Sequence, residues 1–166
     1  AASDVYKRQP VKFTHLDSAG QAHMVDVTDK QPTKRAATAT ATVVCDSAVL
    51  QRITSGQMPK GDVLAVARIA GIAAAKRTPE LLPLAHVIGV HGASVDLVVG
   101  QESIEVTATV RTADRTGVEM EALTAASVAA LALIDMVKGL DRYAFIREVK
   151  LLAKEGGRSG SWRRDA

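Results

Sequence analysis

The chain has 166 residues, of which 47% are hydrophobic and only 3% aromatic, and its formal net charge is +3. This length suffices for one domain with a buried core, which must be built from Ala, Val, Leu and Ile. The small positive charge suits an anionic small molecule, whereas one Trp, two Tyr and two Phe are too few for a base-stacking surface. We therefore expect no nucleic-acid partner.

Cys45 is the only cysteine, which excludes an internal disulfide and a multi-cysteine zinc site. It follows an Ala/Thr/Val alternation, so we expect a small buried residue. No His/Cys/carboxylate spacing resembles a transition-metal site, and no metal ligands are predicted. No uncharged apolar run reaches the ~20 residues of a membrane helix, and residues 1–10 are too polar for a signal peptide. We expect a soluble cytoplasmic protein without a membrane partner.

The first half of the chain predicts one strand followed by helices. Residues 1–12 show no usable periodicity and are expected to be a disordered leader. The Ala/Thr alternation over 36–44 predicts a strand. Asp46 or Ser47 can cap a short helix that ends before Gly56, and Asp62 can cap an apolar helix over 63–76. Thr78-Pro79-Glu80 predicts a further short helix.

The second half predicts a hairpin, a long helix and a last strand. Apolar residues alternate over 95–99 and 104–111 around a turn at 100–103. An alanine-rich helix begins near Glu119 and ends at Gly139, and 146–153 can form the last strand. Residues 156–166 are expected to be a flexible basic Gly/Ser/Arg tail.

Without the short helices, the predicted order is β-α-β-β-α-β, the ferredoxin-like pattern. The predicted class is therefore α+β, with an antiparallel sheet and helices packed on one face. Both long helices are more apolar than contact with one sheet face requires, so we also expect an oligomer.

The long helix carries charged residues only at its ends. Glu119 and Glu121 open it, and Asp135 and Lys138 close it at i, i+3 spacing. Favourable helix-dipole contacts, worth ~0.3–1 kcal/mol each, or an ordinary surface ion pair would also explain them. Glu121 and Asp135 lie ~21 Å apart along a continuous helix, too far to touch one small group together. We therefore predict a site shared between two copies of the chain.

Other candidate residues flank the second helix. Lys60 precedes the capping Asp62 and has no evident structural role, so it is a candidate for proton transfer. Lys76 and Arg77 end that helix, where either the helix dipole or a bound anion explains them. His86 follows in an apolar setting, which suits a hydrogen-bonded structural residue as well as a catalyst.

Several long, ordered blocks of this sequence resemble the molybdenum cofactor biosynthesis protein C (MoaC) family, the cyclic pyranopterin monophosphate synthases. The resemblance extends from about Phe13 to Trp162. The blocks are Thr14-His15-Leu16-Asp17, His23-Met24-Val25-Asp26-Val27, Lys60-Gly61-Asp62-Val63, Ala67 to Ile72, Ala74 to Thr78, Thr116 to Ala125, Asp135-Met136-Val137-Lys138 and Gly156 to Gly160.

The resemblance implies a single catalytic domain over 13–155 with a ferredoxin-like fold. It also implies a homohexamer, built as a trimer of dimers, with active sites at the dimer interfaces. The implied enzyme is a phosphorus–oxygen lyase that acts on (8S)-3′,8-cyclo-7,8-dihydroguanosine 5′-triphosphate. The products are cyclic pyranopterin monophosphate and pyrophosphate. No cofactor is implied, although magnesium can accompany the triphosphate.

The family's functional residues fall on positions of this chain that match its motifs. The implied catalytic residues are Asp135, Lys138 and Lys60. Substrate-binding positions fall on Leu84, Ala85, His86, Glu119, Met120 and Glu121, and Arg35 and Lys76 match basic residues that can hold phosphates.

The chain departs from the family at the histidine segment. The family usually has Leu-Cys-His-Pro, whereas this chain has Leu84-Ala85-His86-Val87, and loss of the proline frees the backbone after the histidine. Two alternatives follow. One is a catalytically impaired paralogue, and the other is a non-enzymatic ferredoxin-like module that binds a nucleotide.

Overall fold

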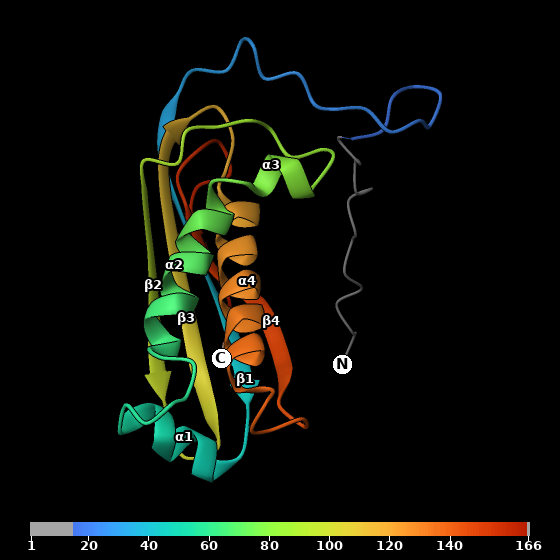
Figure 1. Cartoon of the computed structure of the whole chain (residues 1–166). Coiled ribbons are helices and arrows are strands. Elements are labelled where there is room, and N and C mark those ends of the chain that lie inside the picture. Colours follow the sequence, from blue (N-terminus) through green and yellow to red (C-terminus); the bar gives the residue numbers. More distant parts are fainter. Residues whose placement is uncertain (1–14, 166) are drawn as a thin grey trace, which may run out of the picture.

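The computed structural model describes residues 15–165, so the predicted leader at 1–12 lies outside the described residues. Nine elements follow one another along the chain (Figure 1). In order they are β1 (Thr33–Val44), α1 (Ser47–Thr54), α2 (Val63–Ala75), α3 (Thr78–Leu81), β2 (Gly92–Val99), β3 (Ser103–Asp114), α4 (Glu119–Val137), β4 (Phe145–Glu155) and β5 (Trp162–Arg163).

The strands form one sheet in the order β2-β3-β1-β4-β5, and every pair is antiparallel. The first four strands have the order of a ferredoxin-like sheet, which confirms the predicted fold. β5 adds a short fifth strand along the far end of β4, pairing Trp162 with Lys154. The expected flexibility of residues 156–166 stays a prediction, and the described part of this segment folds back along β4.

The two long helices cover one face of the sheet (Figure 1). The β1 side chains beneath them are small and fully buried, namely Ala37, Ala39, Ala41 and Val43. Threonines alternate with these on the opposite face, where Thr40 Oγ1 donates to the Val106 carbonyl at 2.7 Å. The alternation of Ala and Thr therefore corresponds to a helix-covered face and an open face that carries no helix, where Thr40 and Thr42 are nevertheless buried and hydrogen-bonded.

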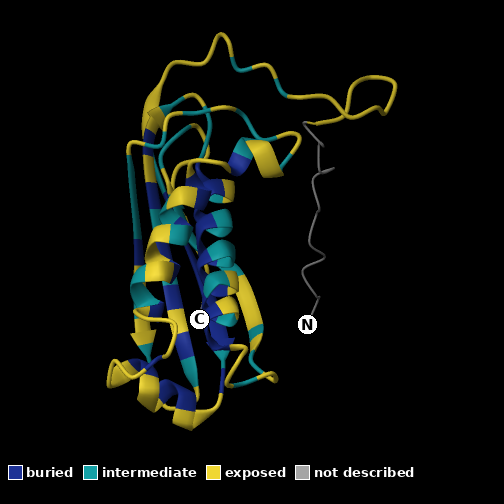
Figure 2. Ribbon diagram, in the orientation of Figure 1, coloured by how far each residue is buried: buried dark blue, intermediate teal, exposed yellow. Residues whose placement is uncertain are grey.

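Close contact between α2 and α4 depends on small residues. Gly71 of α2 faces α4 so closely that an added Cβ would lie 2.9 Å from the Ala125 carbonyl oxygen and 3.1 Å from the Ala129 Cβ. Alanines of α4 complete this contact, and they are fully buried in the core (Figure 2). The helices can thus pack tightly without aromatic residues, as the composition predicted.

α4 has the length and apolar composition of a membrane-spanning helix. In this fold it packs against α2, β1, β3 and β4, and just over half of its apolar stretch is buried inside the chain. This is the behaviour of a core helix. The part that is not buried leaves apolar side chains such as Leu131 on the surface.

Predicted element ends differ from the observed ones by a few residues. Asp46, rather than Ser47, caps α1 by accepting from the Ala48 amide at 2.7 Å. Asp62 caps α2 by accepting from the Ala65 amide at 2.9 Å. Two strands are longer than the alternation of apolar residues indicated: β3 continues to Asp114 and β4 continues to Glu155.

Candidate functional site

The first turn of α4 carries Glu119 and Glu121, which point to different surroundings. Val118 provides no side-chain cap for this helix, so the two acids supply the negative charge that its N-terminus favours. Glu119 reaches β4, where its Oε1 lies 3.1 Å from Lys154 Nζ. Glu121 instead points into the protein and is only 3% exposed.

Burial raises the pKa of Glu121 above its ordinary value, and the negative charge of Glu119 raises it further. The Glu121 backbone amide and the nearby His86 oppose this shift of the pKa. A buried carboxyl group with a raised pKa can exchange a proton near neutral pH more readily than an exposed one. Glu121 is therefore the strongest acid–base candidate at this end of α4.

His86 is held beside Glu121 although the family's proline is absent. Its Nε2 lies 2.6 Å from the carbonyl oxygen of Val25. A carbonyl only accepts, so Nε2 donates the hydrogen of this contact. Val87 is 89% exposed, and the backbone after His86 is placed without a proline. The contact with Val25 thus orients the imidazole ring.

The opposite end of α4 carries a second polar cluster. Lys138 Nζ lies 2.6 Å from Asp135 Oδ1, and both side chains are exposed. The hydrogen bond from Lys138 is the main cause of the lowered pKa of Asp135, and the charges of Lys138 and Lys60 add to it. Asp135 is therefore ionised at neutral pH.

Lys60 belongs to this second cluster and has a structural contact that the sequence did not reveal. Its Nζ donates to the main-chain carbonyl of Asp135 at 2.7 Å. This carbonyl lies in the last turn of α4, where cations are favourable. The interpretation that Lys60 has no structural role was therefore wrong, while its position beside Asp135 and Lys138 fits the predicted group.

The structure thus brings the candidate residues together in two groups rather than one. α4 is continuous from Glu119 to Val137, which puts Glu121 and Asp135 ~21 Å apart along its axis. The first group lies at the α3 end of the molecule and the second at the α1 end (Figure 1). One small substrate cannot touch both groups of a single chain.

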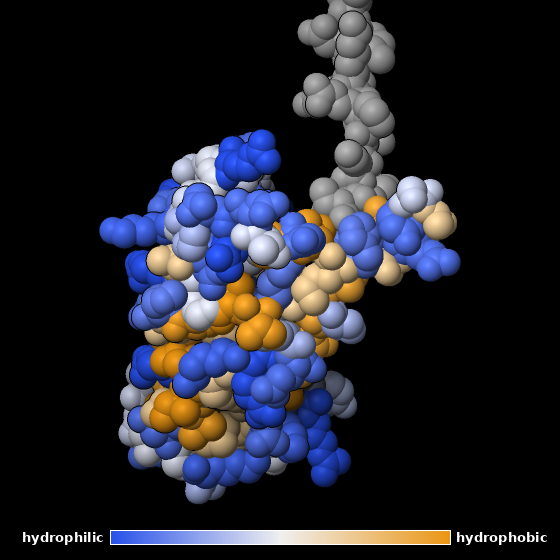
Figure 3. Space-filling view, turned by 90° about the horizontal axis from the view of Figure 1, so that it is seen from above, coloured by the Kyte–Doolittle hydropathy of each residue, from blue (hydrophilic) through white to orange (hydrophobic). Residues whose placement is uncertain are grey.

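The remaining candidates lie at the α3 end. Leu84 and Met120 are exposed, Ala85 is half-buried, and apolar surface lies between hydrophilic groups when this end is seen from above (Figure 3). Lys76 is exposed just after α2, and no ion pair joins it to another candidate within residues 15–165. Arg35 is half-buried and donates from Nε to the Asp114 carbonyl at 3.1 Å.

Lys154 contacts the candidate Glu119, and sequence reasoning did not single it out. Ordinary alternation along β4 would place it on the open face, because Val149 and Leu151 pair with the helix-facing Ala41 and Ala39. A bulge between Leu151 and Ala153 shifts the register, so Lys154 pairs with Ala37 and faces α4. The sequence contained one signal of this position, a charged residue directly after an apolar run. The predicted strand ended at residue 153 and therefore did not include Lys154.

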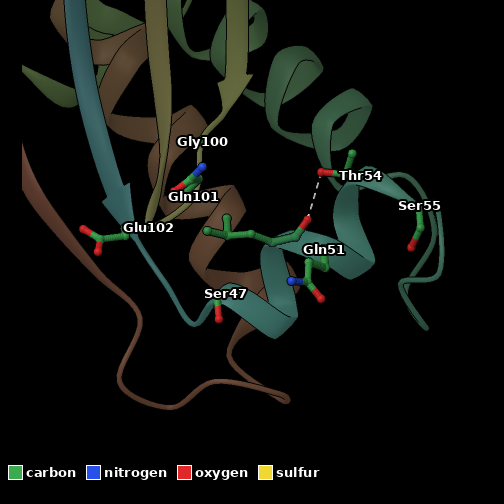
Figure 4. Close-up of a pocket in the computed structure, with 8 residues that line it drawn as sticks. Ser47, Gln51, Thr54, Ser55, Gly100, Gln101 and Glu102 are labelled. Carbon is green, nitrogen blue, oxygen red and sulfur yellow. Dashed lines mark hydrogen bonds between the residues drawn. The ribbon is translucent and has the colours of Figure 1, made fainter.

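A roomy pocket elsewhere offers no comparable chemistry (Figure 4). It lies between α1 and the β2–β3 turn, where Thr54 Oγ1 donates to the Leu50 carbonyl at 3.0 Å. Glu102 is its one ionisable lining residue.

Cys45 is buried, and burial together with nearby negative charges raises the pKa of its thiol to about 11. The thiol is therefore not a nucleophile. Residues 15–165 contain no cluster of three or more His, Cys, Asp or Glu side chains suited to a metal ion.

Comparison with known proteins assigns the sequence of this chain to a family. Residues 24–157 match the model of the MoaC family. The chain is 55% identical over 153 residues to cyclic pyranopterin monophosphate synthase 2 of Mycobacterium tuberculosis, covering 92% of each chain. It is 54% identical to the cyclic pyranopterin monophosphate synthase of Geobacter sulfurreducens, covering 93% of this chain and 98% of the relative. With the ferredoxin-like sheet and the polar groups at both ends of α4, these matches show that the chain belongs to the MoaC family.

Proposed function

We propose that this chain is a cyclic pyranopterin monophosphate synthase of molybdenum cofactor biosynthesis. Its substrate is (8S)-3′,8-cyclo-7,8-dihydroguanosine 5′-triphosphate. The reaction opens the imidazole part of the purine, closes a pterin ring and forms a cyclic phosphate as pyrophosphate leaves. The relatives that support this proposal are about 55% identical and carry the name of this enzyme. The cytoplasmic location of such a biosynthetic enzyme stays a prediction.

The observation that carries the proposal is the buried Glu121 beside His86. A ring rearrangement needs several proton transfers, and each positioned acid or base can contribute ~10²–10⁴-fold to the rate. A carboxyl group with a raised pKa and a neighbouring imidazole are suited to such transfers. The exposed Met120 and Leu84 nearby provide apolar contact for a planar ring.

The second group supplies charge for the phosphate chemistry. Lys60 and Lys138 can stabilise the anionic triphosphate and the leaving pyrophosphate, and either can also move a proton. Asp135 holds Lys138 through the ion pair and so sets its position. A magnesium ion that accompanies the triphosphate stays a prediction.

We place the complete active site between two copies of the chain. The separation of the two groups along α4 supports a site in which the Glu121 group of one copy meets the Lys138 group of another. Exposed apolar side chains on the outer faces of α2 and α4, namely Val66, Ile69 and Leu131, support association. Formation of a homohexamer from three such dimers is the further expectation from the family.

Two alternatives remain distinct from this proposal. A paralogue impaired by the altered histidine segment is disfavoured by the contact between His86 and the Val25 carbonyl. A non-enzymatic nucleotide-binding module would use aromatic residues on the open sheet face. The central strands instead carry threonines there, such as Thr38 and Thr109, whose hydroxyl groups lie 3.1 Å apart.

The direct test is to incubate the purified protein with the cyclised nucleotide and to follow pyrophosphate and the pterin product. We expect turnover by the wild type and loss of at least about 10²-fold in Lys138→Ala and Glu121→Gln. Arg52→Ala, which removes an exposed cation on α1, is the matched control and keeps wild-type turnover. A folded Lys138→Ala protein with normal turnover would contradict the assigned role.

The shared site has its own test. Lys138→Ala and Glu121→Gln proteins are unfolded and refolded together, so that mixed dimers form. A dimer of the two variants has one site with both defects and one without any, so about one quarter of wild-type activity returns. Refolding each variant alone is the control. If the mixture stays as inactive as the single variants, both residues act in the site of one chain.

A further inference from the structure

The segment that joins α3 to β2 carries His86 and contains no helix or strand (Figure 1). Before the histidine, the Ala85 amide donates to the Leu82 carbonyl at 3.1 Å. The next main-chain amide of this segment that finds an acceptor among the described residues is that of Gly89. Ile88 packs against the core, but apolar contacts are not directional. The orientation of the backbone after His86 therefore depends on how Gly89 is held.

Two side chains of β3 hold the Gly89 backbone from both sides. The Gly89 amide donates to Asp114 Oδ2 at 3.2 Å, and Thr112 Oγ1 donates to the Gly89 carbonyl at 2.5 Å. Thr112 is buried, and the His91 ring lies so close that an added Cβ at position 89 would be 3.1 Å from its Cε1. Because hydrogen bonds are directional, these contacts fix the orientation of Gly89.

Asp114, the last residue of β3, is itself held in one orientation. Its Oδ1 accepts from the Arg115 amide at 2.7 Å, which leaves Oδ2 for Gly89. The hydrogen bond from the Arg115 amide is the main cause of the lowered pKa of Asp114, and the Gly89 amide lowers this pKa as well. The carboxylate is therefore ionised at neutral pH. A charged acceptor holds a main-chain amide about twice as strongly as a neutral one.

The end of β3 also holds the segment that faces the histidine. Arg115 Nε donates to the Lys30 carbonyl at 3.0 Å. The same segment begins with Val25, whose carbonyl contacts His86 Nε2 at 2.6 Å. Asp114 and Arg115 thus contact both the segment that carries the imidazole ring and the segment that orients it.

From these contacts we infer that Asp114 is a positioning residue, which holds Gly89 and thereby keeps the His86 imidazole beside Glu121. The inference rests on the proposed function for the part that His86 plays in the reaction. A proline directly after a histidine would restrict the same stretch of backbone, because proline fixes its own φ and limits the residue before it. This chain has the exposed Val87 there, so the contact between Asp114 and Gly89 supplies the restraint that residue 87 does not.

The test combines turnover of the cyclised nucleotide with the nuclear magnetic resonance signal of His86 in protein isotopically labelled at histidine Cε1. The signal is assigned by its loss in His86→Gln. We expect Asp114→Ala to shift this signal and to lower kcat by about tenfold, because misplacement of a proton-transferring group slows the reaction. Asp46→Ala is the matched control, since Asp46 also accepts from a main-chain amide but lies at the α1 end. It leaves both the signal and kcat unchanged.

A second substitution separates positioning from a general effect on stability. Val87→Pro restrains the backbone after His86 independently of Asp114. In that background we expect Asp114→Ala to lower kcat by less than about threefold. A merely structural role of Asp114 would not be relieved by a restraint beside the histidine.

Three results would overturn the inference. They are a wild-type His86 signal in Asp114→Ala, equal effects in Asp46→Ala, or a loss of kcat that Val87→Pro does not relieve. If Val87→Pro by itself impairs the protein, the His86 signal in Asp114→Ala decides. Normal turnover with an unchanged signal in Asp114→Ala removes the positioning role but keeps the proposed function. Absent turnover by the wild type, with a His86 signal that depends on Asp114 and not on Asp46, keeps the positioning role but removes the proposed function.

Discussion

Replacement of Gly71 by alanine tests the close contact that sets the distance between α2 and α4. The new Cβ would lie 2.9 Å from the Ala125 carbonyl oxygen, 3.0 Å from Val95 Cγ2 and 3.1 Å from the Ala129 Cβ. All three atoms belong to the packed core, and such overpacking costs about 1–3 kcal/mol. Alanine regains about 1 kcal/mol of helix propensity over glycine. The expected net result is a destabilisation of about 1 kcal/mol.

The assay is urea denaturation followed by far-ultraviolet circular dichroism, because Trp162 is too exposed to report on the core. Protein concentration is held constant, since subunit association would contribute to stability. In a thermal unfolding experiment, the same loss lowers the Tm by about 2–4 °C. Lys60 precedes α2 and contacts α4, so a forced shift of the helices also displaces Lys60 from Asp135.

The matched control is Ala73→Gly, which makes the reverse change at an exposed position of the same helix. It measures the propensity difference without the core contact, and about 1 kcal/mol of destabilisation is expected. If Gly71→Ala stabilises the protein by as much as Ala73→Gly destabilises it, the steric cost is absent. The argument that Gly71 limits the helix separation would then be refuted.

Three further predictions concern individual side chains. Burial raises the pKa of Glu121 in the folded protein above its reference value of 4.5. The protonated side chain therefore contributes fully to the stability of the folded protein below about pH 4.5. This contribution is lost as the pH rises through the raised pKa of the folded state. Glu121→Gln therefore gains stability relative to the wild type over that range, and a pH-independent difference in urea denaturation would contradict this. Lys154→Met, which breaks the pair with Glu119, lowers kcat/KM by about tenfold, with a stability loss of about 1 kcal/mol or less. Lys150→Met, which breaks the pair with Glu148, is its matched control and leaves kcat/KM unchanged. Cys45→Ala keeps full turnover, and the native thiol reacts slowly with a disulfide reagent at pH 8 because its pKa is about 11; rapid reaction would contradict burial.

Much of the fold could be predicted because local patterns agree with the tertiary structure. Alternation of Ala and Thr in β1 reflects its covered and open faces, and Asp46 and Asp62 cap the helices that follow them. The apolar stretch between Glu121 and Asp135 similarly reflects burial of α4 in the core. Each of these signals depends on neighbours in the sequence, so the amino-acid order alone is sufficient.

The candidate site was predictable only in part. The sequence indicated which acids and bases lie at the ends of α4 and that they are too far apart to act together within one chain. It did not reveal that Lys60 donates to the Asp135 carbonyl or that the Val25 carbonyl orients His86. These contacts join residues distant in the chain, and no local pattern specifies them.

The sequence by itself determined the element order, the small-residue core and the chemical nature of the groups at both ends of α4. Only the tertiary structure decided which way Lys154 points and that residues 157–159 lie against Arg35. The physical reason is the register of β4. One extra residue at the bulge turns every later side chain to the other face of the sheet, and the partner strand determines where that residue is accommodated.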